Sequence, residues 1–179
     1  MIKSNPDLFG GYNGVTFKND GQYRLALWRI WDDKLPKVMF IGLNPSTANE
    51  STDDPTIRRV KTFAKNWGFG GVYMLNLFTY VTAYPEELKT CRYPVLFADP
   101  FLLRYSKLAS KIIFAWGSFK EAKNRGKEVI QMFPDGEVLG INKDGSPKHP
   151  LYISGKTKPF AYKELKFLIL PYSTRHAIH

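Results

Sequence analysis

Short apolar runs that end at turn residues recur along the chain and predict buried strands. Val38–Leu43 reads VMFIGL and ends at Asn-Pro, which is typical of a buried strand that runs into a loop. Val72–Leu77 and Lys111–Ala115 have the same composition, and Glu137–Ile141 is a further candidate strand. The pattern therefore predicts about four strands.

A helix is predicted over Asp54–Trp67 from its start, its apolar face and its end. Asp54 is a typical N-cap residue, Pro55 suits the first helical position, and Gly68 follows the last apolar position. The apolar residues that share one helical face are Ile57, Val60, Ala64 and Trp67.

Two further helices are predicted between and after the later strands. Asp99-Pro100 is typical of a helix start, and Ser118 with Glu121 forms a capping box for a helix that runs to about Phe133. Because strands and helices alternate, we expect an α/β fold with three layers, α/β/α, and a mostly parallel central sheet of about four strands.

The length of the chain, 179 residues, fits one domain with its own core. No internal repeat and no Pro- or Gly-rich linker divides it, so we expect a single domain over residues 1–179. We also expect a loose N-terminal segment over about 1–20 and a flexible tail over about 172–179. An aromatic share of 15% excludes disorder over the rest of the chain.

Charge and cysteine content narrow the partners and the compartment. Lys and Arg outnumber Asp and Glu by 26 to 16, which favours nucleic acid or nucleotides as partners, although a merely basic surface is equally compatible. The lone cysteine, Cys91, and the absence of a secretory signal predict a cytoplasmic protein. No apolar run approaches the ~20 residues that span a bilayer, so we expect no membrane contact.

The sequence points to no cofactor and no metal. It contains no phosphate-binding glycine loop and no Gly-x-Ser-x-Gly motif. His176 and His179 lie close together near the C-terminus, but no Cys, Asp or Glu nearby would complete a metal site.

Polar residues follow the predicted strands, and in open parallel sheets ligands bind beyond the carboxyl ends of the strands. The candidate site residues at these ends are Asn44, Ser46, Thr47, Asn76, Thr79, Trp116 and His149.

Each of the three main candidates has two interpretations. Asn44 either orients a water or a substrate edge, or only forms an Asx turn. Asn76 lies in an apolar strand, so its amide needs partners, which are either backbone groups or a ligand. His149 sits between prolines in a stiff loop and either stabilises a developing anion or is an ordinary surface histidine.

Carboxylates and guanidinium groups mix where the predicted helix begins. Asp54 is explained as the cap, which leaves Asp53 as a spare carboxylate and a candidate general base. Arg58 and Arg59 either bind phosphate or pair with these aspartates. The aromatic residues suited to stacking on a base are Tyr152, Trp67 and Trp116.

Four stretches together resemble the domain-of-unknown-function 1643 family (DUF1643). They read FIGLNPSTANESTDDPTIRR, WGFGGVYMLNLFTY, AWG at Ala115–Gly117, and GSPKHPLYI, and they run in the same order from about Tyr23 to Tyr152. The stretch CRYPVLFADPF departs from the family's pattern. The resemblance names no reaction.

Shorter motifs resemble the uracil-DNA glycosylase superfamily. They are the Gly-Leu-Asn-Pro that contains Asn44, the strand-end Asn76, the strand ending in Trp116-Gly117, and the His149-Pro150 pair. The resemblance implies a parallel sheet between helices. It also implies that Asn44 positions the attacking water, Asn76 recognises the base, and His149 stabilises negative charge on the departing base. Two departures are the missing activating aspartate of the most active branch and Leu151 in place of the usual serine.

The resulting hypothesis is an enzyme that processes a nucleobase or nucleotide and hydrolyses an N-glycosidic bond by analogy with those glycosylases. Fold kinship alone does not fix function. The alternative is a binding module that holds a nucleotide, DNA or RNA without catalysis, through Arg58, Arg59 and the basic surface.

Overall fold

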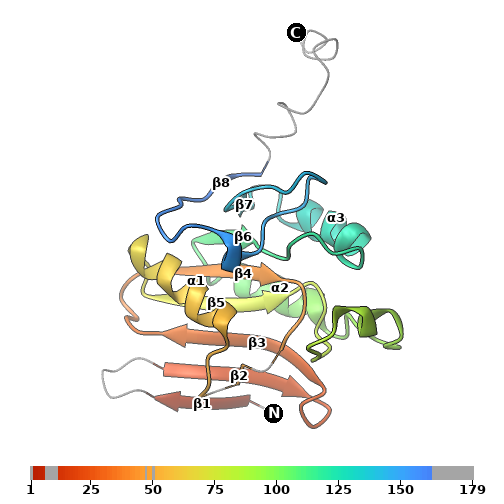
Figure 1. The fold of residues 1–179 in the computed structure, drawn as a ribbon. Coiled ribbons are helices and arrows are strands. Elements are labelled where there is room, and N and C mark those ends of the chain that lie inside the picture. Colours follow the sequence, from red (N-terminus) through yellow and green to blue (C-terminus); the bar gives the residue numbers. More distant parts are fainter. Residues whose placement is uncertain (1, 7–11, 47, 50, 163–179) are drawn as a thin grey trace, which may run out of the picture.

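One mixed β-sheet organises the molecule. The computed structural model describes residues 2–6, 12–46, 48–49 and 51–162, which form an eight-stranded sheet in the order β1-β2-β3-β5-β4-β6-β7-β8 (Figure 1). The strands are β1 (Ile2–Pro6), β2 (Tyr12–Lys18), β3 (Tyr23–Ile30), β4 (Lys37–Gly42), β5 (Gly71–Asn76), β6 (Lys111–Phe114), β7 (Glu137–Val138) and β8 (Phe160–Ala161).

The sheet is half antiparallel, which corrects the predicted fold. Strands β5, β4, β6 and β7 pair in parallel, whereas β1, β2, β3 and β5 pair successively antiparallel and β8 adds antiparallel to β7. The prediction of a mostly parallel sheet of about four strands, as in uracil-DNA glycosylases, is therefore wrong. The general α/β class is what holds.

The antiparallel half arises from an N-terminal hairpin. Asn19, Asp20 and Gly21 take positive φ angles of 49°, 50° and 95° and turn β2 back onto β3, a geometry that these residue types favour. Residues 12–18, predicted to be part of a loose N-terminal segment, thus form a paired strand. The tail predicted over about 172–179 lies outside the described residues.

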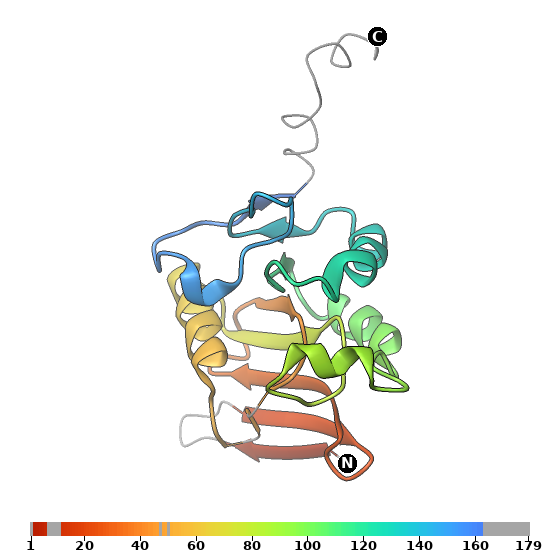
Figure 2. The ribbon, with the colours of Figure 1, turned by 45° about the vertical axis from the view of Figure 1, so that its right-hand side comes forward.

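Helices cover both faces of the sheet (Figure 2). Helix α1 (Pro55–Asn66) packs on one face, and α2 (Ala98–Ser106) and α3 (Ala122–Met132) pack on the other. Two short 3-10 helices, η1 (Pro85–Lys89) and η2 (Pro150–Tyr152), lie in connecting segments. The sheet consequently separates two apolar cores.

The predicted start of α1 is confirmed. The Asp54 carboxylate accepts a hydrogen bond from the Ile57 backbone N–H at 2.8 Å, and Pro55 occupies the first helical position. Ile57 and the residues that share its face are buried against the sheet. Apolar burial and the cap together fix the N-terminus of α1 near the ends of β4 and β5.

The predicted capping box of α3 and the predicted length of the last strand are wrong. Helix α3 begins at Ala122, the Ser118 hydroxyl donates to Asp144, and Glu121 pairs with Lys89 at 3.0 Å. Strand β7 ends at Val138, and the chain then curves through a turn in which Ile141 bridges Pro147. Long-range partners, which local spacing does not encode, hold these side chains.

Candidate functional site

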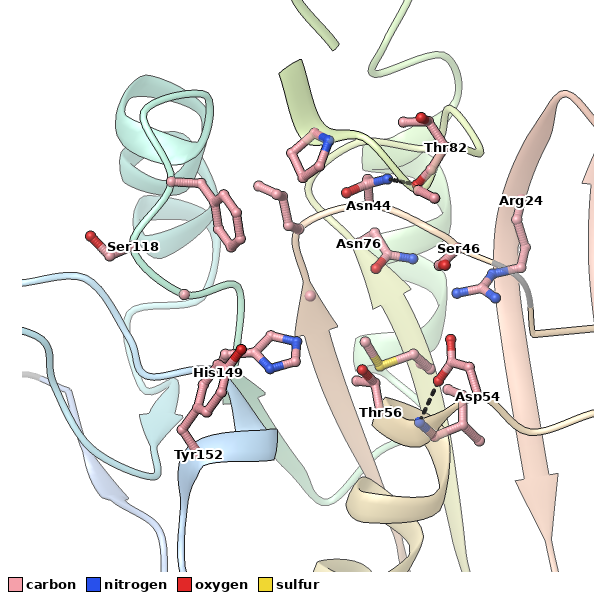
Figure 3. A pocket seen from close by; sticks show the side chains of 18 of the residues that line it. Arg24, Asn44, Ser46, Asp54, Thr56, Asn76, Thr82, Ser118, His149 and Tyr152 are labelled. Carbon is pink, nitrogen blue, oxygen red and sulfur yellow. Dashed lines mark hydrogen bonds between the residues drawn. The ribbon is translucent and has the colours of Figure 1, made fainter. Parts of the chain in front are cut away.

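A cavity of about 410 Å³ opens where the parallel strands β4 and β5 end (Figure 3). This volume lies within the range of small-ligand sites. The loops after β4, β5 and β6, the start of α1 and the segment before η2 all contribute to its wall. The residues that line it and carry the discussion below are Arg24, Gly42, Asn44, Ser46, Asp54, Asn76, Ser118, Phe119, Asn142, His149 and Tyr152.

Asn76 presents an unsatisfied polar atom to this cavity. Its side chain is 4% exposed, and among the described residues its Oδ1 has no hydrogen-bond partner. A buried amide oxygen without a partner costs on the order of 1–3 kcal/mol, so native proteins rarely keep one without a reason. The geometry favours the ligand interpretation of Asn76 over the structural one.

Asn44 is held by its amide nitrogen. Nδ2 donates to the backbone oxygens of Thr82 at 2.7 Å and Pro45 at 3.0 Å, which ties the loop after β4 to the loop after β5. Within the described part of the chain no donor reaches Oδ1. Both interpretations of Asn44 therefore have support, because the nitrogen shapes the loop and the oxygen remains available to accept from water or a ligand.

His149 enters the cavity from the segment that precedes η2. Its Nδ1 accepts a hydrogen bond from the Leu151 backbone N–H at 3.4 Å, which places the proton of the neutral imidazole on Nε2. Burial lowers the pKa of His149 below its ordinary value of 6.5, and the charge of Asp54 opposes this shift. At neutral pH the ring is consequently an uncharged hydrogen-bond donor.

Arg24 and Asp54 are cavity residues that the sequence analysis did not propose. Arg24 is 2% exposed, its Nη1 donates to the Ala48 oxygen at 2.9 Å, and its Nε has no partner among the described residues. Burial lowers the pKa of Arg24 to about 10, partly offset by Asp54, so it stays cationic at neutral pH. An arginine within the otherwise apolar β3 is the signal that would have found it.

Asp53 lies outside the cavity. Its Oδ1 accepts from Arg29 Nε at 2.8 Å and its Oδ2 accepts from Lys61 Nζ at 2.7 Å. Burial alone would raise the pKa of Asp53, but the hydrogen bonds from Lys61 and Arg29 outweigh it and lower the pKa. A carboxylate held by two cations is a poor proton acceptor, so the structure does not support Asp53 as the general base. Asp54 is the carboxylate that lines the cavity.

The two arginines of α1 also point elsewhere. Arg58 donates to the Asp53 backbone oxygen, and Arg59 donates to the backbone oxygens of Pro150 and Ile153 while lying over the Phe63 ring. Neither lines the cavity, so the predicted phosphate or aspartate side-chain contacts are not what these groups make. Arg59 instead fixes the η2 segment, which carries His149, against α1.

The remaining candidates divide between the cavity and the core. Ser46 lines the cavity, and Tyr152 lies at its rim with a side chain that is 85% exposed. The Thr79 hydroxyl donates to the Leu96 oxygen at 2.8 Å, and Trp116 is buried beside Phe114. Thr47 lies outside the described residues, and Trp67 stacks on Phe63 in the core.

Two searches over the described residues bear on metals and membranes. No group of three or more His, Cys, Asp or Glu side chains in that part of the chain is arranged to hold a metal ion. No helix there is both long enough and apolar enough to pass through a bilayer.

The fold and the cavity define an α/β protein with a buried polar site at the end of its parallel strands. Residues 24–151 match the family described as Protein of unknown function (DUF1643), and the chain belongs to that family. This confirms the resemblance read from the sequence. No curated protein and no solved structure matches the chain, and the resemblance to uracil-DNA glycosylases stays a hypothesis.

Proposed function

We propose that this cavity binds the base of a nucleobase-containing ligand and that the protein hydrolyses the N-glycosidic bond of that base. The observation that carries the proposal is the meeting of Asn44, Asn76 and His149 in one cavity, with the Asn76 oxygen buried and unpaired. Three strand-end segments, distant along the chain, supply these groups.

Asn76 is suited to reading the edge of the base. Its free oxygen requires an N–H donor, and its amide nitrogen offers a donor in return. The ligand edge that complements an amide carries an N–H beside a carbonyl, as in uracil, hypoxanthine and other oxo-bases. A site built to bond such an edge rejects analogues that lack it, because a buried polar group is then left unpaired.

His149 is suited to stabilising the departing base. When the bond between the sugar carbon and the base nitrogen breaks, its electron pair stays on the base, and negative charge spreads to the base carbonyl oxygens. The Nε2–H of a neutral His149 donates a hydrogen bond to that charge in a largely dehydrated cavity. Donors of this kind are worth about 10²–10³ in rate.

Asn44 and Asp54 are suited to handling the water. Asn44 Oδ1 accepts a hydrogen bond from the water and orients its oxygen toward the sugar carbon. As the new carbon–oxygen bond forms, an Asp54 carboxylate oxygen takes the water proton, while the other oxygen caps α1. That proton then passes to the base nitrogen through solvent, so the products are the free base and the sugar bearing a hydroxyl.

The test is release of free base, followed by chromatography. The substrates are oligonucleotides with uracil, hypoxanthine or a mismatch, and a panel of nucleosides. We expect release from at least one oxo-base substrate and a loss of about 100-fold or more in Asn44→Ala and His149→Ala. Asn124→Ala, an exposed change on α3 away from the cavity, is the matched control and should keep full rate.

Two results would overturn the proposal. One is the absence of free base from every substrate, and the other is full activity in both alanine variants. Base binding without release would instead support the alternative of a non-catalytic binding module.

A further inference from the structure

A second cavity adjoins the first. It has a volume of about 580 Å³ and lies between the start of α3 and the turn around Gly145. Ser118 and Phe119 line both cavities, so the two spaces meet along the loop after β6. A ligand that fills the first cavity can therefore continue into the second without leaving the surface.

Unpaired lysines line this second cavity. Lys120, Lys123 and Lys127 are exposed and belong to its wall, and none of them forms an ion pair within the described residues. The neighbouring carboxylates Glu121 and Glu128 are engaged by other cations, namely Lys89 and Arg125. The wall thus keeps an uncompensated positive charge.

One carboxylate does lie in this wall, and it faces hydroxyl groups. Asp144 accepts hydrogen bonds from the hydroxyls of Ser118 and Ser146 and from the Ser146 backbone N–H. These bonds shape the turn opposite α3 and leave the lysines free of it. The second cavity consequently carries more positive than negative side chains.

An aromatic side chain marks the junction of the two spaces. Phe119 is 41% exposed, and it lies against Gly117, where a Cβ would come within 3.1 Å of its ring. Gly117 also has a φ of +80°, a conformation that favours glycine. The loop is therefore built to hold Phe119 at the rim, where an exposed ring offers a face for stacking.

We propose that the two cavities together bind one single strand of nucleic acid, with one base in the first cavity, Phe119 against the adjoining base, and Lys120, Lys123 and Lys127 along the phosphates that follow. This proposal rests on the proposed function for the base, and it makes the substrate a polymer. A net charge of +10 is in keeping with a polyanionic partner.

The spacing of the lysines favours a strand over a free nucleotide. Lys123 and Lys127 lie one turn apart on α3, so their Cβ atoms are about 6 Å apart, and Lys120 extends the row beyond the helix start. A row of this length exceeds the width of one phosphate group. It matches successive phosphates of a chain that runs away from the base-binding cavity.

The test compares two triple variants of equal charge. One is Lys120→Gln/Lys123→Gln/Lys127→Gln, and the control removes three exposed lysines outside both cavities, Lys34→Gln/Lys107→Gln/Lys158→Gln. Binding of a labelled strand of about 12 nucleotides, as DNA and as RNA, is measured by anisotropy over a salt series. Hydrolysis of a free nucleoside is measured in parallel.

We expect the first triple variant to flatten the salt dependence by about two units of log K against log salt, since each lost phosphate contact on a single strand removes about 0.7. Between about 50 and about 200 mM salt this removes a roughly 20-fold change in affinity. The control should change the slope little, and both variants should act on a free nucleoside like the parent.

Equal salt slopes in the two triple variants would overturn the strand proposal, as would a parent protein whose strand affinity does not depend on salt. The outcome is independent of catalysis. If no base is released from any substrate but the slopes differ as expected, the proposed reaction fails while the strand-binding surface stands.

Discussion

Gly42 and Asn76 are partners at the ends of the parallel strands β4 and β5, and a Cβ on Gly42 would lie 2.9 Å from the Asn76 Oδ1. It would also lie 2.6 Å from the Met74 methyl group. The absence of a side chain at Gly42 therefore keeps the floor of the cavity open beside the unpaired amide.

Gly42→Ala should close this floor. Met74 is flexible and can turn aside, but Asn76 is enclosed, so we expect its amide to move and base affinity to fall by about tenfold or more. Overpacking of this kind costs on the order of 1–3 kcal/mol of stability. Gly155→Ala is the control, since its new Cβ meets only Arg59 at ordinary contact distance. Calorimetric titration with free bases and a thermal melt measure both effects, and unchanged affinity in Gly42→Ala would contradict this view of the floor.

Asn76→Leu should separate function from stability. The substitution removes a buried oxygen that has no partner within the described residues and replaces it with a group of similar size. We therefore expect unchanged stability or a gain of about 1 kcal/mol, together with loss of base binding. The contrast is Asn142→Leu, which removes an amide bonded to the Ser146 hydroxyl at 3.0 Å and should destabilise the fold. Urea unfolding measures both, and a marked loss of stability in Asn76→Leu would show that the amide is structural.

The pH dependence of His149 follows from its lowered pKa. Since the folded pKa lies below 6.5, the neutral donor form is fully present above 6.5 and is lost only as the pH falls through the lower folded value. Base release should stay level from pH 8 to about 6.5 and decline below. Stability should fall over the same window, because the unfolded chain takes up the proton first. An NMR titration of the imidazole, assigned with His149→Gln, checks the shift, and a folded pKa above 6.5 would refute it.

Asp53 should be a stability residue. Arg29 is 2% exposed, and Asp53→Asn would leave its charge poorly compensated, at a cost of about 3 kcal/mol. In the parent, the lowered pKa of Asp53 contributes stability above its ordinary value of 3.8 that is lost as the pH falls below 3.8 toward the folded value. Acid unfolding of the parent and urea unfolding of the variant measure these effects. Base release by whatever Asp53→Asn stays folded should match the parent, and a selective loss of rate would restore Asp53 as a catalytic candidate.

Local sequence was sufficient for those features that neighbouring residues encode. The cap of Asp54 and the buried strands around Val38 and Val72 follow from side-chain chemistry and apolar runs within a few residues. Asn44, Asn76 and His149 could be selected in the same way, because polar groups that end apolar strands collect at one edge of a parallel pair.

The tertiary structure decided what depends on partners far along the chain. Strand direction in the N-terminal half is set by a hairpin whose last strand, β3, is buried throughout, so it shows no alternation and carries two arginines. The choice between Asp53 and Asp54 is similar, since both adjoin the same helix start. Only the arrival of Arg29 and Lys61 beside Asp53 leaves Asp54 to face the cavity. Short-range patterns fix which groups are polar or buried, whereas pairing energies between distant segments determine which of them meet.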